Sequence, residues 1–293
     1  MQNNCIREAI DMNFLFTVSD SYTNPILLLM FSIYKNMGGG HTFYFIHKDI
    51  SVENQRAIIS YAKKQCQSNA VFVCFTDPQV SQLPLQGSWS EEVYFRLFAP
   101  YLLPDIKKVL YLDGDTLVTD SLCDLWDDPV VNQYPIGAVA NDVQTKHKAR
   151  LSLPDEATYI NSGVLLMNLE RIRMMYSEKD IWNKLFELRS LLQFPDQDFI
   201  NIVFQRDLML LDVRYNYMIN LIERVDTYPK IHDHKICHFV LSKPWNVEFM
   251  FKTDRVYLKY LVRAGRIKEA LSLYYQHRKR RWGTRIKSIL KLR

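Results

Sequence analysis

Residues 107–115 read Lys-Lys-Val-Leu-Tyr-Leu-Asp-Gly-Asp. The apolar part has the length and composition of a buried β-strand, and it runs directly into two carboxylates separated by one glycine. In an open α/β sheet, ligands bind beyond the carboxyl ends of the strands. Asp113 and Asp115 can therefore converge on one hard cation, Mg²⁺ or Mn²⁺, which substrate phosphates and water usually complete. Gly114 lets the backbone bend and approach a ligand closely.

The acidic triplet alone is a weak signal for a cation site. Asp-Gly is common in turns, and a second Asp-x-Asp triplet, Asp196-Gln197-Asp198, occurs further along the chain. The position directly after an apolar strand is what favours a functional interpretation of Asp113 and Asp115.

The flanking segments alternate between strand and helix patterns, which implies a parallel sheet with helices on both faces. The first helix opens at Asn24-Pro25, with proline at a favoured first position, and ends at the glycines 38–40. The predicted strands are 13–19, 42–47, 70–75, 107–112, 136–141, 163–168 and 235–238. The further predicted helices are 52–66, 91–98, 177–192 and 195–204.

The composition is that of a folded protein with a basic tail. The chain has 293 residues, of which 48% are hydrophobic, and this length suits one large α/β domain with a tail. From Arg263 to Arg293 there are eleven Lys or Arg residues and one acid, Glu269, which is a net charge of +10 against +5 for the whole chain. We predict a catalytic domain at 1–250 and a basic helical tail at 251–293.

The apolar runs and the cysteines predict a reduced, cytoplasmic protein. The run Phe14 to Val18 is too short for a secretory signal and lacks a basic lead-in. The longest apolar run, Pro25 to Phe31, is far shorter than a bilayer span. The five cysteines show no paired spacing.

The tail has the pattern of a membrane-surface helix. Trp282, Ile286, Ile289 and Leu290 fall on one helical face, with basic residues around it. A tryptophan with basic flanks suits the interface of an anionic membrane, so we expect peripheral association with the inner face of the membrane. A helix packed on the body and a nucleic-acid patch are the alternatives. No nucleic-acid recognition motif is present, and we expect no nucleic-acid partner.

A longer run around the acidic pair is far more specific. From Tyr94-Phe95-Arg96-Leu97 through residues 108–118 to Leu125-Trp126, the chain resembles glycosyltransferase family 8. This family includes bacterial lipopolysaccharide galactosyl- and glucosyltransferases and glycogenin. The resemblance covers roughly residues 13–250. Four further segments agree in order and spacing: 16–22, 159–168, 194–201, and His238-Phe239 followed by Lys243-Pro244-Trp245.

The resemblance implies an α/β fold of the GT-A type, a mostly parallel Rossmann-like sheet flanked by helices. It also implies that Asp113, Asp115 and His238 ligate Mn²⁺ (or Mg²⁺), with His238 using a neutral imidazole nitrogen. Lys243 would meet the diphosphate of a UDP-sugar as a compact charge. The implied nucleotide-binding residues are Thr17, Val18, Ser19, Tyr22, Leu112, Gly114 and Lys243, with Tyr22 stacked on the uracil. The implied donor-sugar residues are Arg96, Asn161, Ser162 and Asp196.

Structural alternatives exist for several of these residues. Taken alone, His238 is more often a structural histidine, and Tyr22 could be a packing residue at a helix entry. Arg96 could form a salt bridge on a helix surface. Asp196 could be an N-terminal helix acid, which the helix dipole favours.

The resemblance further implies a retaining hexosyltransferase that moves glucose or galactose from UDP-glucose or UDP-galactose. The acceptor would be a glycan or a lipid-linked glycan such as lipopolysaccharide. A double displacement needs a carboxylate beside the anomeric carbon, but the matching position is the amide Gln197, a poor nucleophile. We therefore favour front-side attack, with Gln197 beside the anomeric carbon and Asp196 as the fallback nucleophile. We expect the polar segment 142–158 to be mobile and to close over the donor.

Two positions depart from the family pattern. Ser19 stands where many relatives have an acid, and Leu241 stands where many have a glycine that would allow close backbone approach to phosphate. These departures leave a second hypothesis open: a nucleotide-sugar-binding protein with little or no transfer activity.

Overall fold

The computed structural model describes residues 11–87, 89–141, 145–240, 242–246 and 252–290, and of residues 279–290 it describes the backbone alone. The predicted departure at Leu241 lies outside the described residues, as do residues 142–144 of the polar segment. The side chains of the predicted apolar face of the tail, from Trp282 to Leu290, also lie outside them.

A seven-stranded sheet forms the centre of the molecule, in the order β3-β2-β1-β4-β7-β6-β8. Only β7 among these strands runs antiparallel to its neighbours, β4 and β6, so the predicted mostly parallel sheet is confirmed. The strands are β1 (Asn13–Thr17), β2 (Thr42–His47), β3 (Asn69–Cys74), β4 (Lys108–Leu112), β6 (Ile136–Ala140), β7 (Ile160–Asn168) and β8 (Leu208–Leu211).

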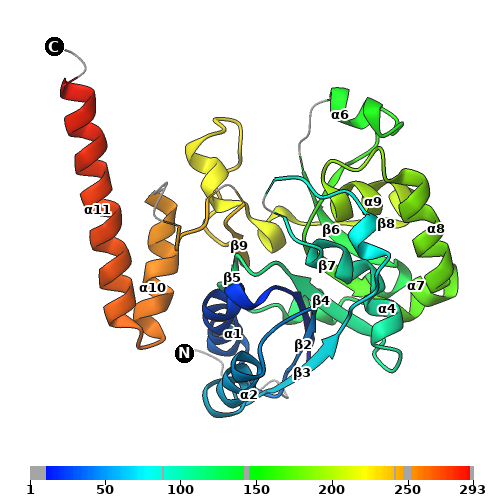
Figure 1. The fold of residues 1–293 in the computed structure, drawn as a ribbon, viewed down its shortest axis with the longest axis horizontal. Helices are drawn as coiled ribbons and strands as arrows, with labels where there is room; N and C mark the ends of the chain where they lie inside the picture. The colour runs from blue at the N-terminus through cyan, green and yellow to red at the C-terminus, as the bar shows by residue number, and fades with distance from the viewer. Residues whose placement is uncertain (1–10, 88, 142–144, 241, 247–251, 291–293) are drawn as a thin grey trace, which may run out of the picture.

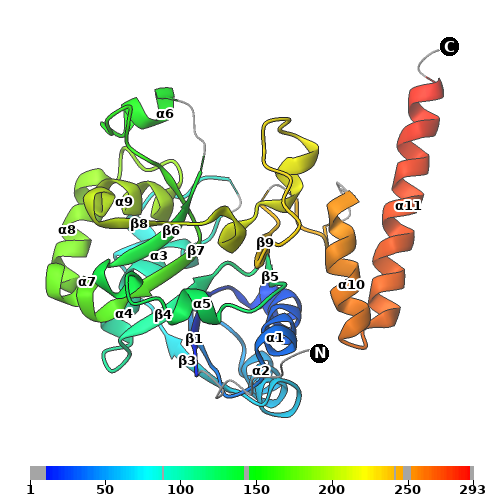
Figure 2. The same ribbon diagram turned by 180° about the vertical axis from the view of Figure 1, so that it is seen from behind.

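Helices cover both faces of this sheet (Figures 1 and 2). Alternate residues of a strand point to opposite faces, so Phe14 and Phe16 of β1 pack in one core cluster and Leu15 packs in the other. The face with Phe14 and Phe16 is covered by α1 (Thr23–Met37), α2 (Val52–Cys66) and α5 (Cys123–Trp126). The opposite face is covered by α3 (Glu92–Phe95), α4 (Ala99–Leu102), α7 (Leu169–Met175), α8 (Glu178–Leu188) and α9 (Pro195–Val203).

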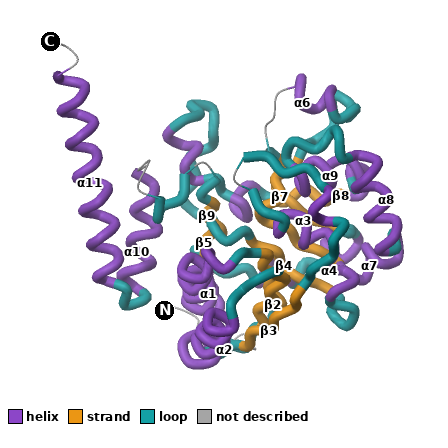
Figure 3. Tube along the Cα trace, viewed as in Figure 1, coloured by secondary structure: helices purple, strands orange, loops and turns teal. Residues whose placement is uncertain are grey.

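A second, two-stranded sheet lies beside the first and connects it to the C-terminal helices (Figure 3). It consists of β5 (Thr116–Val118) and β9 (Ile236–His238), and the helices are α10 (Arg255–Arg263) and α11 (Ile267–Leu290). Tyr257 and Leu261 of α10 are buried in one cluster with Leu117 of β5 and Phe239. The views from both sides show α10 and α11 side by side, at the end of the molecule opposite α8. Among the described residues, no helix combines the length and apolar character that a bilayer crossing requires.

The sequence patterns missed two strands. β5 has only three residues, and its pairing with β9 joins segments that are far apart in the chain. β8 is a four-residue strand at the edge of the sheet and is only partly buried, so it lacks the long apolar run that marks the central strands.

Candidate active site

Three segments of the chain meet at the carboxyl end of β4. The N–H of Asp113, the residue that follows β4, donates a hydrogen bond to the carbonyl of Gly163 in β7 (2.8 Å). β5 pairs antiparallel with β9, which places Thr116 opposite His238. The N–H of Phe239 then donates to the carbonyl of Asp115 (3.0 Å). This pairing brings a histidine from far along the chain to the two acids.

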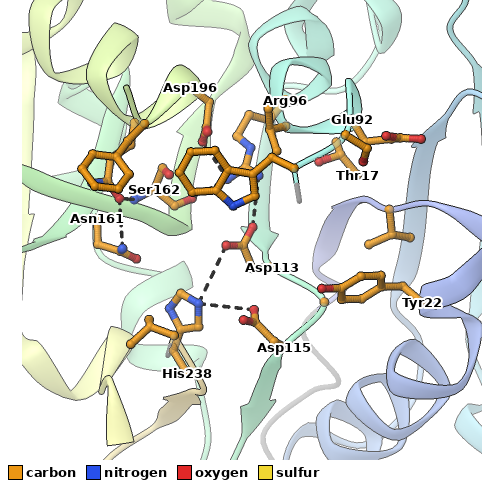
Figure 4. A pocket seen from close by; sticks show the side chains of 18 of the residues that line it. Thr17, Tyr22, Glu92, Arg96, Asp113, Asp115, Asn161, Ser162, Asp196 and His238 are labelled. Atoms are coloured by element: carbon orange, nitrogen blue, oxygen red, sulfur yellow. Dashed lines mark hydrogen bonds and ion pairs between the residues drawn. The ribbon is translucent and has the colours of Figure 1, made fainter. Parts of the chain in front are cut away.

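The predicted metal ligands lie together (Figure 4). One atom each of Asp113, Asp115 and His238 lies within 4.8 Å of the others. Nε2 of His238 is 3.3 Å from Oδ1 of Asp115 and 3.8 Å from Oδ2 of Asp113. Nδ1 of His238 is 2.8 Å from the amide oxygen of Asn216. Because that oxygen only accepts, Nδ1 is the donor in this bond, which leaves Nε2 as the ring nitrogen that faces the two carboxylate oxygens. This donor set fits a divalent cation.

The outer oxygens of both acids are held by neighbouring groups. The hydroxyl of Tyr111 donates to Oδ1 of Asp113 (2.6 Å), and Nη2 of Arg96 is 3.1 Å from the same oxygen. Lys243 donates to Oδ2 of Asp115 and to the carbonyl of Phe239 (3.1 Å). Burial opposes the charge of Asp115, but Lys243 and His238 outweigh it and hold the pKa of that carboxyl well below its ordinary value. Asp115 is therefore ionised.

Arg96 is buried and connects the cation site with the predicted sugar site. Its guanidinium lies 4.0 Å from the centroid of the Tyr111 ring, and Nη1 is 3.0 Å from Oδ2 of Asp196 and 2.8 Å from the carbonyl of Ser162. Burial lowers the pKa of Arg96, but the negative charges of Asp196 and Asp113 outweigh burial and raise it. Burial raises the pKa of Asp196, and Arg96 opposes that rise. A salt bridge on a helix surface, the structural alternative for Arg96, is therefore wrong.

A cavity of about 490 Å³ opens above these groups. The predicted nucleotide residues Thr17, Tyr22 and Lys243 line it, and Figure 4 places Tyr22 and Thr17 at one end and Asn161, Ser162 and Asp196 at the other. Leu112 is the exception among the predicted site residues. Its side chain is fully buried in the α1-side core because alternate residues of β4 point to opposite faces. The other predicted residues that line the cavity are Val18, Ser19, Arg96, Asp113, Gly114, Asp115, Gln197 and His238.

Gly114 is explained by close packing against the aromatic ring at the nucleotide end. A Cβ on Gly114 would lie 2.7 Å from Cδ1 of Tyr22 and 3.2 Å from Cγ1 of Val18. The edge of the Tyr22 ring also faces Trp245, with ring centroids 5.9 Å apart. The absence of a side chain at residue 114 therefore lets Tyr22 lie directly beside the acidic pair.

The amide of Gln197 is held in one orientation. Its oxygen accepts from Nδ2 of Asn161 (3.0 Å) and from the N–H of Ser162 (3.1 Å). Its nitrogen donates to the hydroxyl of Tyr159 (3.0 Å), which itself donates to Oδ1 of Asp198 (2.5 Å). Burial and the charge of Asp198 raise the pKa of Tyr159 strongly, so the hydroxyl keeps its proton for Asp198 and can only accept from Gln197.

The predicted mobile segment contains a short helix, α6 (Thr145–Arg150), that is attached to this network. His147 and Arg150 lie 2.8 and 3.2 Å from the buried carboxylate of Asp198. Leu151 and Leu153 are buried in a small cluster with Tyr159. Residues 145–158 of the segment expected to be mobile are thus attached to the body by two basic side chains and two buried leucines, and the mobility of the segment stays a prediction. Its closure over the donor stays a prediction.

Several residues of the site carried no interpretable sequence signal. Asn216 contacts both His238 and, through its Nδ2, Asn161 (2.7 Å), yet it ends a short 3-10 helix, Val213–Asn216, that carries no motif. Tyr111 occupies an ordinary strand position. The only sequence signal for it is that neighbouring residues of a strand point to opposite faces, which separates Tyr111 from Leu112. Glu92, Trp89 and Phe194 also line the cavity.

The sequence profile of glycosyl transferase family 8 matches residues 13–248. The chain belongs to glycosyltransferase family 8. The resemblance stated from the sequence is thus confirmed, and the matched range contains every residue of the cavity described above.

Two relatives of this family 8 chain show how much of its sequence is shared with other proteins. A protein of Haemophilus influenzae is 29% identical over 215 residues, which are 70% of this chain and 63% of the relative, so the chain spans less than two thirds of that protein. A lipopolysaccharide 1,2-glucosyltransferase of Escherichia coli is 26% identical over 259 residues, which are 82% of this chain and 74% of the relative.

The solved structures confirm the fold of this family 8 chain. The galactosyltransferase LgtC, in complex with donor and acceptor sugar analogs, superposes with a TM-score of 0.76 at 23% sequence identity. The superposition covers 85% of this chain and 95% of LgtC. The predicted GT-A type of α/β fold is therefore confirmed.

Proposed function

We propose that this chain is a retaining hexosyltransferase that moves glucose or galactose from a UDP-sugar to a glycan acceptor. The convergence of Asp113, Asp115 and His238 at the floor of the cavity carries the proposal. Three ligand groups of this type hold a hard divalent cation, Mn²⁺ or Mg²⁺. The names of the Escherichia coli relative and of LgtC support a hexose donor.

The cavity has separate regions for the three parts of such a donor. The diphosphate fits beside Asp113, Asp115 and Lys243, where Lys243 supplies a compact positive charge. The nucleoside fits at the end with Tyr22, and the hexose fits at the end with Asn161 and Ser162. A bound divalent cation would offset the negative charge that develops on the leaving diphosphate.

The orientation of Gln197 supports front-side attack. Its amide oxygen is turned toward Asn161 and Ser162 by two donors, so Gln197 can stabilise positive charge at the sugar but does not offer a carboxylate nucleophile. Asp196 is held by Arg96 at 3.0 Å, and an ion-paired carboxylate is a weaker nucleophile. The departing phosphate then takes the acceptor's proton, and the anomeric configuration is retained.

The function is tested by UDP release from a panel of UDP-sugars, with and without Mn²⁺. We expect slow hydrolysis of UDP-glucose or UDP-galactose that stops on chelation and returns with Mn²⁺. Binding of a UDP-sugar with neither hydrolysis nor transfer to any acceptor offered would favour the nucleotide-sugar-binding alternative. Lack of binding to every UDP-sugar in the panel would contradict the proposed donor.

Asn216 is expected to position His238 for the cation. Replacing it with alanine removes the acceptor for Nδ1–H, so we expect Mn²⁺ affinity to fall about 10–100-fold. Asn216→Asp keeps an acceptor and should retain most of the affinity. Calorimetric titration with Mn²⁺ checks this, with Asn132→Ala on the exposed surface as the control. Equal losses in Asn216→Ala and Asn216→Asp would mean that Asn216 acts through Asn161 instead.

Two half-exposed aromatic rings at the rim of the cavity provide a surface for the acceptor. Trp89 and Phe194 are 41% and 40% exposed, with ring centroids 5.7 Å apart. Sugar rings stack on such surfaces, so we expect Trp89→Ala to raise the KM of an oligosaccharide acceptor about tenfold, with a smaller change for the donor. Tyr275→Ala, an exposed aromatic on α11, is the control. A rise confined to the donor KM would contradict this assignment.

Membrane association through the tail also remains a proposal. Leu271 and Tyr275 of α11 are 50% and 63% exposed, and Val262 of α10 is 50% exposed. These apolar groups lie among the basic residues of the tail, which is the composition expected of a helix on an anionic surface. Such contact would bring the cavity to a lipid-linked acceptor such as lipopolysaccharide.

A further inference from the structure

Glu92 lines the donor cavity, near enough to Lys48 and His47 to interact with them electrostatically but without an ion pair to either. It begins α3 and is 6% exposed, and it lines the cavity between Thr17 and Arg96. The structure gives its carboxylate neither a hydrogen bond nor an ion pair with any described residue. The other carboxylates of the cavity are all paired: Asp113 and Asp196 with Arg96, and Asp115 with Lys243.

The neighbouring residue, Glu91, shows the contrast. Its carboxylate is bound by Nζ of Lys48 at 2.8 Å and lies outside the donor cavity, at a separate pocket of about 160 Å³. The two consecutive glutamates thus differ: Glu91 forms an ion pair with Lys48, whereas Glu92 forms none with a described residue and lines the cavity in which the donor is proposed to bind.

The end of β1 supplies no carboxylate to this region. Asp20 uses Oδ1 to accept hydrogen bonds from the N–H of Ser51 (2.9 Å) and from Nδ2 of Asn54 (2.7 Å) at the start of α2. The hydroxyl of Ser19 lies 2.9 Å from that of Ser21. Glu92 is therefore the unpaired carboxylate at the nucleoside end, on the side of Thr17 and Tyr22 in Figure 4.

A ligand that displaces water from the Glu92 carboxylate must bring an N–H or O–H group in its place, because a carboxylate that loses its hydrogen-bond donors is costly. The diphosphate carries only acceptors and negative charge, so it would be repelled. The proposed place of the hexose is the other end of the cavity, where Figure 4 shows Asn161 and Asp196. The nucleoside is the part of the donor that can satisfy Glu92, through the imide N–H of uracil or the hydroxyls of ribose.

We propose that Glu92 binds the nucleoside of the donor by accepting a hydrogen bond from the imide N–H of uracil, and so selects uracil over cytosine. The inference rests on the proposed UDP-sugar function. Cytosine presents a lone pair at the same ring position, which a carboxylate repels. Uracil stacked on Tyr22 would present this edge within the nucleoside end of the cavity, where Glu92 takes the place of the acid that Ser19 does not provide.

The test compares the affinities of UDP, CDP and 2′-deoxy-UDP in the presence of Mn²⁺, for wild type, Glu92→Gln and Glu91→Gln. We expect Glu92→Gln to weaken UDP binding about tenfold and to narrow the preference of UDP over CDP. Glu91→Gln should match wild type. Thermal denaturation shows whether each variant folds, and Glu92→Asp, which keeps the charge, should bind UDP better than Glu92→Gln.

Three results would overturn the assignment. Equal affinities in Glu92→Gln and Glu91→Gln would mean that Glu92 does not contact the nucleoside. An equal loss for UDP and CDP would remove the base as the partner. If Glu92→Gln loses the preference for UDP over 2′-deoxy-UDP but keeps the preference for UDP over CDP, the hydrogen bond is to the ribose and not to the base. Failure of the wild type to bind any uridine nucleotide would instead refute the proposed function, and this inference with it.

Discussion

Asp115→Asn is expected to lower the cation-dependent kcat/KM for the UDP-sugar about a thousandfold, which corresponds to about 4 kcal/mol of transition-state stabilisation. The substitution keeps the shape of the side chain but removes the charge that faces Nε2 of His238 at 3.3 Å. It also leaves the half-buried Lys243 without its carboxylate partner. The donor diphosphate and the cation would both be held less firmly.

The measurement is UDP release under saturating Mn²⁺, together with Mn²⁺ titration of the free protein. Asp120→Asn is the matched control, because Asp120 follows β5 in the same stretch but its side chain is 58% exposed and pairs with Lys235. It should retain wild-type activity. An Asp115→Asn protein whose kcat/KM remains within tenfold of wild type would show that the acidic pair does not hold the cation.

Gly163→Ala is expected to lower Mn²⁺ affinity at least about a hundredfold. A Cβ on Gly163 would lie 2.2 Å from Cε1 of His238 and 2.9 Å from Oδ2 of Asp113. Gly163 is in β7, which is paired on both sides by β4 and β6, so the backbone cannot easily move aside. The imidazole must move instead, and overpacking of this kind costs about 1–3 kcal/mol of stability.

Gly137→Ala provides a matched control on the neighbouring strand. A Cβ there would meet Cδ2 of Leu211 at 3.2 Å, the far end of a flexible side chain. Thermal denaturation of both variants separates the stability cost from the loss of the cation site. Wild-type Mn²⁺ affinity in a folded Gly163→Ala protein would show that His238 does not need its present position to bind the cation.

The sequence predicted well where signals were local. The strand at Lys108–Leu112 was visible because its last four residues, 109–112, are consecutive apolar residues, and α2 was predicted with the bounds Val52–Cys66. Family patterns placed most of the site, since the residues that match them line one cavity. Leu112 shows the limit of such transfer, because a residue next to a motif can still point into the core.

Contacts between distant segments could not be predicted from local patterns. The amide of Asn216 reaches His238 and Asn161, and nothing in its neighbours along the chain marks it. The polar segment around His147 reads as surface because its charges have no visible partner in the sequence, whereas the fold supplies the buried Asp198. Glu91 and Glu92 are the same residue type at adjacent positions, and they differ only in the groups that surround them in the fold.

The sequence by itself determined the alternation of strands and helices, because burial on both faces of a central strand requires a continuous apolar run. It also determined where the acidic pair falls, because Asp113 and Asp115 directly follow such a run. The resemblance named His238 and Lys243 as partners of that pair, but only the tertiary structure decided how they reach it and that Asn216 holds the histidine. These contacts depend on the pairing of β5 with β9 and on the packing of α3 and α9 over the sheet. Pairing between segments that are far apart in the chain leaves no periodic pattern in the sequence of either segment.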